Sequence, residues 1–187
     1  MRIVLQRVKE ARVDVDGKTA GRIGRGVCLL VGIEKGDGEA DAEFLAGKCV
    51  SLRIFPDEAG KMNLSLADTG GEVLAVSQFT LAASVRKGRR PSFDNAEDPA
   101  RAAELFDHFV GVLEALGITV ETGVFQAAME VHILKKVLGD PDRFCVGPDE
   151  AQGCRGGFLH DVAQLPRQRQ PPLSLHGRGF DKEQIAA

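Results

Sequence analysis

The sequence lacks tryptophan and tyrosine, so its ten phenylalanines supply all of the aromatic packing. No apolar run approaches the roughly 18 residues that a membrane-spanning helix needs, and no signal-peptide pattern is present. We therefore expect a cytoplasmic protein with no membrane partner. The net charge of −3 provides no broad cationic field, so an RNA partner would have to be held by a local basic patch.

Cysteine is scarce, and its spacing excludes the common metal and redox motifs. The four cysteines are Cys28, Cys49, Cys145 and Cys154, and no two of them form a CxxC pair. Cys28 and Cys49 lie in apolar stretches and are predicted to be buried thiols. No other residues have metal-ligand spacing, so no metal is expected.

The first third of the chain has the alternation of β-strands. In residues 2–8 (RIVLQRV), Ile3 and Leu5 share one face. Asp16-Gly17 predicts a two-residue hairpin turn, because these residue types easily adopt positive φ. Residues 26–33 (GVCLLVGI) are continuously apolar, which predicts a central strand buried on both faces. Further strands are expected at residues 52–55, 71–81, 118–125 and 128–134.

Two amphipathic helices are predicted. Asp37 or Gly38 can cap the first, and Asp98 followed by Pro99 begins the second, which ends at Gly117. The expected buried positions are Ala42, Leu45, Ala46, Cys49 and Val50 in the first helix, and Ala102, Leu105, Phe106, Phe109, Val112, Leu113 and Leu116 in the second.

The C-terminal quarter has a different character. From Lys135 onward there is no sustained period of 2 or 3.6, and five of the eight prolines fall here. We predict one domain over residues 1–134 and an irregular, poorly ordered tail over residues 135–187. The short steps between strands favour an α+β fold, with a curved antiparallel sheet and helices on one face.

The stretch VSQFTL (residues 76–81) holds the most suggestive chemistry. Ser77 or Thr80 could be a nucleophile, but a hydroxyl needs a neighbouring base, and no Ser–His–acid pattern is present. One alternative is that both hydroxyls satisfy local backbone groups. Another is a pocket wall, in which backbone N–H groups at a strand end hold an oxyanion beside Gln78 and Phe79.

The loop RKGRR is the only dense basic cluster. Arg86, Lys87, Arg89 and Arg90 are expected either to contact phosphates of tRNA or to form an ordinary solvated loop. The acidic pair Glu97 and Asp98 is explained by capping of the second helix.

Five blocks together carry a family resemblance: MRIVLQRV, LRIFPDEAGKMNLSL, VSQFTL, KGRRPSF and VETGVFQAAMEV, in that order. Over residues 1–134 the chain resembles the D-aminoacyl-tRNA deacylase family. The resemblance implies a homodimer of compact, β-barrel-like subunits with helices packed outside. It implies hydrolysis of the ester between a D-amino acid, or glycine, and the terminal adenosine of tRNA, with no metal or organic cofactor.

The resemblance also assigns roles to residues. It implies that Ser77, Gln78, Phe79 and Thr80 form the catalytic pocket, while the substrate's ribose 2′-hydroxyl activates the water. It implies that Arg7 steadies a chiral-selection loop of the neighbouring subunit, and that Met129 lies in the segment approaching the terminal adenosine.

After residue 134 the chain departs from the family pattern. The family continues with Asn-Asp-Gly-Pro-Val-Thr, whose Gly-Pro excludes L-amino acids from the partner's pocket. Here Gly147-Pro148 comes about ten residues late and is followed by Asp149-Glu150. We interpret the change as a shifted reading frame near the codons for Leu134 and Lys135. The alternative function is a non-catalytic relative that keeps the scaffold for binding tRNA or protein.

Overall fold

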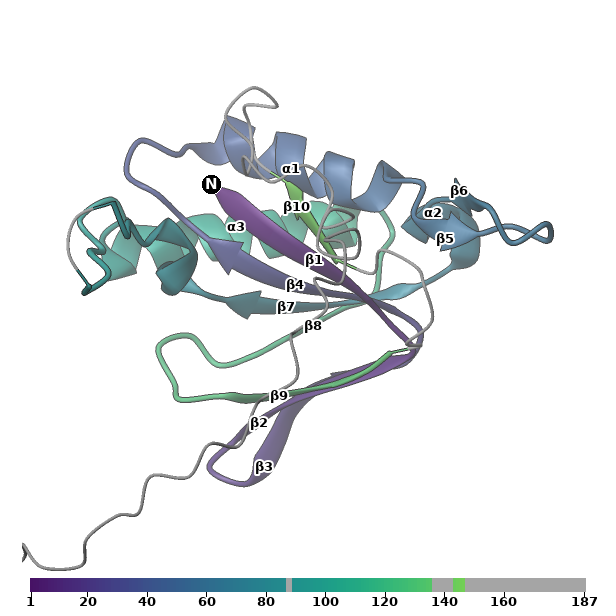
Figure 1. Cartoon of the computed structure of the whole chain (residues 1–187), viewed down its shortest axis with the longest axis horizontal. Helices are drawn as coiled ribbons and strands as arrows, with labels where there is room; N and C mark the ends of the chain where they lie inside the picture. The colour runs from purple at the N-terminus through teal and green to yellow at the C-terminus, as the bar shows by residue number, and fades with distance from the viewer. Residues whose placement is uncertain (87–88, 136–142, 147–187) are drawn as a thin grey trace, which may run out of the picture.

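The computed structural model describes residues 1–86, 89–135 and 143–146 (Figure 1), the last four as backbone only. The helices are α1 (Glu39–Ser51), α2 (Leu66–Thr69), α3 (Pro99–Ala115) and the 3₁₀ turn η1 (Phe79–Ala82). The strands are β1 (Arg2–Val8), β2 (Glu10–Val15), β3 (Lys18–Ile23), β4 (Gly26–Gly32), β5 (Phe55–Pro56), β6 (Met62–Leu64), β7 (Glu72–Ser77), β8 (Val120–Thr122), β9 (Glu130–Leu134) and β10 (Arg143–Val146).

A five-stranded sheet lies at the centre of the fold. Its strand order is β10-β1-β4-β7-β8, and a separate three-stranded sheet has the order β3-β2-β9. Helices α1 and α3 cover one face of the larger sheet, and the smaller sheet lies on the other side (Figure 1). The larger sheet is therefore enclosed on both faces.

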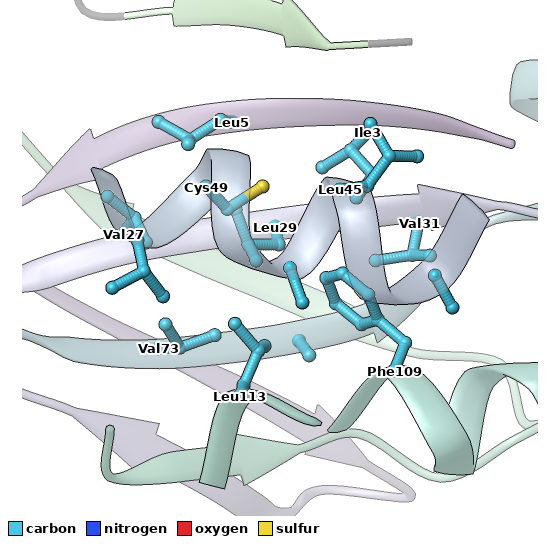
Figure 2. Close-up of a cluster of buried hydrophobic side chains, with 14 of the residues drawn as sticks. Ile3, Leu5, Val27, Leu29, Val31, Leu45, Cys49, Val73, Phe109 and Leu113 are labelled. Carbon is cyan, nitrogen blue, oxygen red and sulfur yellow. The ribbon is translucent and has the colours of Figure 1, made fainter. Parts of the chain in front are cut away.

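The main core fills the space between the larger sheet and the two long helices. Figure 2 shows apolar side chains of β1, β4 and β7 meeting Leu45 and Cys49 of α1 and Phe109 and Leu113 of α3. A second cluster on the opposite face joins Cys28 and Leu74 to residues of the smaller sheet. Because alternate residues of β4 enter the two clusters, the prediction of a strand buried on both faces is confirmed.

The two predicted helices are confirmed, but three residues that were predicted to be buried in α3 are not fully buried. Ala102 and Val112 are half-buried. The five buried residues of α1 are those predicted. Asp98 caps α3 by accepting a hydrogen bond from the Ala100 amide at 3.0 Å, with Pro99 as the first helical residue. Leu116, predicted to be buried, is 49% exposed, because it follows the last turn and Gly117 redirects the chain at φ +83°.

The α+β class is confirmed, but the larger sheet is mixed. β4 pairs with β7 and β7 pairs with β8 in parallel, whereas the other strand pairings are antiparallel as predicted. The hairpin at Asp16-Gly17 has the expected positive φ values of 48° and 74°. The strand expected at residues 52–55 is reduced to Phe55–Pro56, because Leu52 still caps the end of α1, where its amide donates to the Lys48 carbonyl at 3.0 Å.

One strand lies within the predicted irregular region. β10 pairs antiparallel with β1, matching Ile3 with Val146 and Gln6 with Arg143, so these four residues are not irregular. The remainder of the predicted tail, residues 136–142 and 147–187, lies outside the described residues. Across the described ranges, no helix combines the length and apolar content of a membrane span.

Candidate functional site at the end of strand β7

The backbone leaves the sheet abruptly after Ser77, the last residue of β7. The Gln78 amide still donates to the Val31 carbonyl at 2.7 Å, and the chain then enters η1. The turn packs directly against Gly32 at the end of β4, where a Cβ would lie 2.7 Å from Leu81 Cβ. Glycine at position 32 therefore lets residues 77–80, the SQFT segment, turn back across the end of the sheet.

A pocket of about 780 Å³ opens beside this turn. Three segments build it: the end of β7 with η1, the residues leading into α3, and the connection from β8 to β9. The lining residues are Ile33, Val76, Ser77, Gln78, Phe79, Ala96, Glu97, Pro99, Ala102, Phe125, Gln126, Ala127, Met129 and Val131. The structure thus brings together four of the six residues predicted for catalysis and substrate binding.

The β8–β9 connection forms the opposite wall. A Cβ at position 123 would lie 2.5 Å from Met129 Sδ. The methionine side chain can occupy this position because Gly123 has no side chain. Phe125 contacts Phe106 of α3, with ring centroids 6.4 Å apart. Gln126 adopts φ +62°, a conformation that is uncommon for a residue other than glycine and that clusters at functional sites.

No base is hydrogen-bonded to the Thr80 hydroxyl among the described residues. The hydroxyl accepts a hydrogen bond from the Gln78 side-chain amide, and Thr80 does not line the pocket. The His108 imidazole lies 3.4 Å from Glu43 on the helical side, and His132 lies 3.2 Å from Asp14 on the smaller sheet. Neither histidine lines the pocket, so the geometry of the described residues does not support an activated hydroxyl.

Backbone donors are present at the same turn. The first hydrogen bond of η1 runs from the Leu81 amide to the Gln78 carbonyl at 3.2 Å. The amides of Phe79 and Thr80 precede it, and neither donates to a backbone carbonyl outside the turn among the described residues. Two consecutive N–H groups next to a pocket can stabilise an oxyanion in acyl transfer.

The rim of the pocket carries an aromatic pair beside the basic loop. Phe79 and Phe93 meet edge to face, with centroids 5.1 Å apart, and are 58% and 38% exposed. The basic loop is closed by paired hydrogen bonds between Ser84 and Ser92 at 2.8 and 2.9 Å. Arg86, Arg89 and Arg90 in this loop are exposed, and Lys87 lies outside the described residues.

Arg7 lies away from the pocket. In the sheet register Arg7 pairs with Val27 and Val27 with Val73, four residues before Ser77 along β7. That separation corresponds to about 13 Å along a strand. The guanidinium donates to the Ile54 carbonyl at the far end of the sheet. Arg7 is not among the residues that line the pocket.

Sequence reasoning missed the residues that reach the pocket from loops. Glu97 is the only ionisable side chain among the lining residues, and its carboxylate accepts the Asp98 amide at 2.8 Å. Glu97 therefore accepts a hydrogen bond at the start of α3, as the capping prediction requires, and it also lines the pocket. Phe93 could have been noticed, since an aromatic residue follows a dense basic cluster. Within the described ranges, no cluster of histidine, cysteine or acidic side chains could hold a metal ion.

Comparison with known proteins identifies the family. The family model described as D-Tyr-tRNA(Tyr) deacylase matches residues 4–136. The chain belongs to this deacylase family. A D-aminoacyl-tRNA deacylase of Geobacter sulfurreducens is 57% identical over 134 residues, covering 72% of this chain and 88% of that protein. One from Thermomicrobium roseum is 60% identical over 134 residues, covering 72% and 87%.

Two solved structures have a similar fold. A structure described as the c-Myc DNA unwinding element binding protein superposes with a TM-score of 0.73 at 35% identity, covering 80% of this chain and 99% of that one. A probable eukaryotic D-amino acid tRNA deacylase superposes with a TM-score of 0.66 at 18% identity, covering 78% and 97%. The second likeness concerns the fold alone.

The match to the family model ends near the residue at which the sequence departs from the family pattern. The family model ends at residue 136, close to the point where the family resemblance ends in the sequence. Gly147-Pro148, the only Gly-Pro pair beyond that point, lies outside the described residues.

Proposed function

We propose that this chain hydrolyses the ester that joins a D-amino acid to the 3′-terminal adenosine of tRNA. The observation that carries the proposal is the pocket at the end of β7, where Ser77, Gln78 and Phe79 face Met129 in a chain of the deacylase family. The resemblance extends the substrates to glycine mischarged on alanine tRNA. The reaction returns free tRNA and the amino acid.

The chemistry requires little of the side chains. A water molecule attacks the ester carbonyl, the ribose 3′-oxygen leaves with a proton, and the 2′-hydroxyl of the substrate assists the attack. We expect the amides of Phe79 and Thr80 to stabilise the oxyanion that develops on the carbonyl, because neither donates to a backbone carbonyl outside the turn among the described residues. A substrate whose terminal ribose lacks the 2′-hydroxyl should therefore react at least a hundredfold more slowly.

The partners follow from the same proposal. The 3′ end of an aminoacyl-tRNA enters the pocket, and the arginines of the basic loop contact its phosphates with Lys87. Two subunits form a homodimer in the cytoplasm, in which Arg7 steadies a loop of the neighbouring subunit. No cofactor takes part, because the substrate supplies the base.

The deciding experiment compares matched substrates. Release of amino acid from D-Tyr-tRNA and L-Tyr-tRNA is measured with the full chain at equal enzyme concentration. Cleavage of the D form alone supports the proposal. Equal cleavage of both would show a working centre without chiral selection. Binding of tRNA with no cleavage of either form would favour the alternative, a non-catalytic relative. The departure from the family pattern after residue 134 is the observation that motivates this alternative.

The reading-frame hypothesis has a separate test. Translation of the neighbouring frames of the gene from the codon for Leu134 should yield Gly-Pro-Val-Thr followed by a short strand. If no frame encodes that motif, the frameshift hypothesis fails and residues 135–187 are a genuine extension.

A further inference from the structure

The Phe79–Phe93 pair at the pocket rim is exposed to solvent, and the proposed ester hydrolysis does not explain this exposure. Phe93 does not line the pocket, yet it holds Phe79, which does, in an edge-to-face contact with an interplanar angle of 61°. A large apolar ring is usually buried, but 38% of Phe93 and 58% of Phe79 are open to solvent. Because each ring supports the other, the exposed surface of the pair is held in place at little further cost in side-chain entropy.

The surroundings of the pair carry positive charge. Phe93 directly follows the Ser84–Ser92 bridge that closes the basic loop. Arg89 and Arg90 of that loop precede Phe93 in the sequence by four and three residues. Neither arginine forms an ion pair or a side-chain hydrogen bond with a described residue. Exposed aromatic rings beside unpaired arginines are the combination that binds single-stranded nucleic acid, through base stacking and phosphate contact. An apolar peptide would use the rings but not the arginines.

We propose that Phe93, supported by Phe79, stacks on the unpaired base next to the terminal adenosine of the tRNA, while Arg89 and Arg90 contact the adjacent phosphates. The inference deepens the proposed function, on which it rests for the identity of the RNA. Phe79 belongs to both the pocket and the pair, so a nucleotide bound in the pocket places its neighbour at Phe93. Stacking is tolerant of base identity, so this contact adds affinity for the single-stranded end without reading its sequence.

The test uses uncharged RNA and the full chain. Two fluorescein-labelled hairpins share one acceptor stem, and only one carries the three unpaired 3′ nucleotides. We expect the tailed hairpin to bind the wild-type chain more tightly. Phe93→Leu should weaken that binding by about tenfold and leave binding of the blunt hairpin unchanged. Arg90→Gln should weaken both and lower the slope of log K against log salt by about one.

Phe44→Leu is the matched control, because Phe44 is also a solvent-exposed phenylalanine, 52% exposed, but lies on α1. Equal affinity of the Phe93→Leu and Phe44→Leu variants for the tailed hairpin would overturn the proposal, and so would equal binding of both hairpins by the wild-type chain. Melting temperatures of the two variants show whether Phe93→Leu folds.

A second measurement needs no variant. With 2-aminopurine in place of the base next to the terminal adenosine, stacking on Phe93 should change its fluorescence on binding, and unchanged fluorescence contradicts the proposal. None of these RNAs carries an aminoacyl ester, so the binding results are independent of the proposed hydrolysis. Stacking with no deacylation refutes only the enzyme, and deacylation with no stacking refutes only this contact.

Discussion

The side-chain amide of Gln78 donates a hydrogen bond to the hydroxyl of Thr80, and no histidine, lysine or carboxylate is hydrogen-bonded to that hydroxyl in the described part of the chain. The glutamine amide cannot remove a proton, so the contact fixes the hydroxyl without activating it. We therefore expect Thr80 to support the turn, and the backbone amides around it to contact the reacting ester.

Replacement of Thr80 by valine should therefore reduce kcat/KM for D-Tyr-tRNA by no more than roughly tenfold, whereas loss of a true nucleophile typically costs 10⁴-fold or more. Thr19→Val is the matched control, since Thr19 also makes a side-chain hydrogen bond, to Asp14 at 2.8 Å, on the distant hairpin. A loss above a thousandfold for Thr80→Val alone would restore the hydroxyl as the nucleophile.

Gly123→Ala tests the wall opposite the turn. The added Cβ would lie 2.5 Å from Met129 Sδ, so the methionine must move within the pocket. We expect a loss of about tenfold in kcat/KM, measured by deacylation, because small displacements of positioning groups are costly. In Gly111→Ala on α3 the Cβ meets nothing within 4 Å, and the melting temperature should rise, since alanine favours a helix over glycine by about 0.5–1 kcal/mol. Unchanged kinetics in Gly123→Ala would mean that Met129 does not position the substrate.

The sequence predicted the elements whose residues are neighbours along the chain. The apolar stripe of α1 repeats at helical spacing, and Asp16-Gly17 carries its own turn preference, so local physics was sufficient for both. The parallel pairing of β4 with β7 was missed, because α1, β5, β6 and α2 separate the two strands and no local pattern encodes such a neighbour.

In the candidate site, too, the segments that are continuous in sequence were predicted and the residues that come together only in the fold were not. The SQFT segment and Met129 were identified by resemblance, and the pocket brings Ser77, Gln78, Phe79 and Met129 together. Glu97 and Gln126 were missed because they reach the pocket from separate loops, and their approach depends on the packing of α3 and of the β8–β9 connection. A loop residue has no periodicity to indicate which face it presents.

Acid should weaken the start of α2 through one carboxylate. The hydrogen bond from the Ser65 side chain is the main cause that lowers the pKa of Asp68 below its usual value of 3.8, assisted by the Ser65 amide and Arg53. The folded form thus favours the charged carboxylate, so its stabilisation is present above pH 3.8 and is lost as the pH falls through the folded pKa. The difference in melting temperature between wild type and Asp68→Asn should shrink below about pH 4.

Asp107→Asn is the control for that titration, because Asp107 lies on the exposed side of α3. The melting temperature of this variant is measured against wild type over the same pH range. A gap for Asp68→Asn that persists at pH 2 would show that the charge is not the source of the stabilisation.

The buried thiols should be inert in the folded protein. Burial raises the pKa of Cys28 to about 11 and that of Cys49 to about 12, so the reactive thiolate is nearly absent at pH 8. Iodoacetamide at pH 8, followed by mass spectrometry of the peptides, should leave both residues unmodified until the chain is unfolded in denaturant. Labelling of Cys28 or Cys49 under native conditions, faster than global unfolding allows, would contradict the packing.

The order of strands in the larger sheet also constrains when the pocket can exist during synthesis. β7 lies between β4 and β8, and β8 begins only at Val120. The opposite wall ends still later, with Val131 of β9. A nascent chain that has exposed β7 therefore carries the SQFT segment without its pocket, and contacts this distant in sequence form slowly. We therefore expect hydrolytic competence only after about 130 residues have left the ribosome, and we expect the shortest active fragment to include β9.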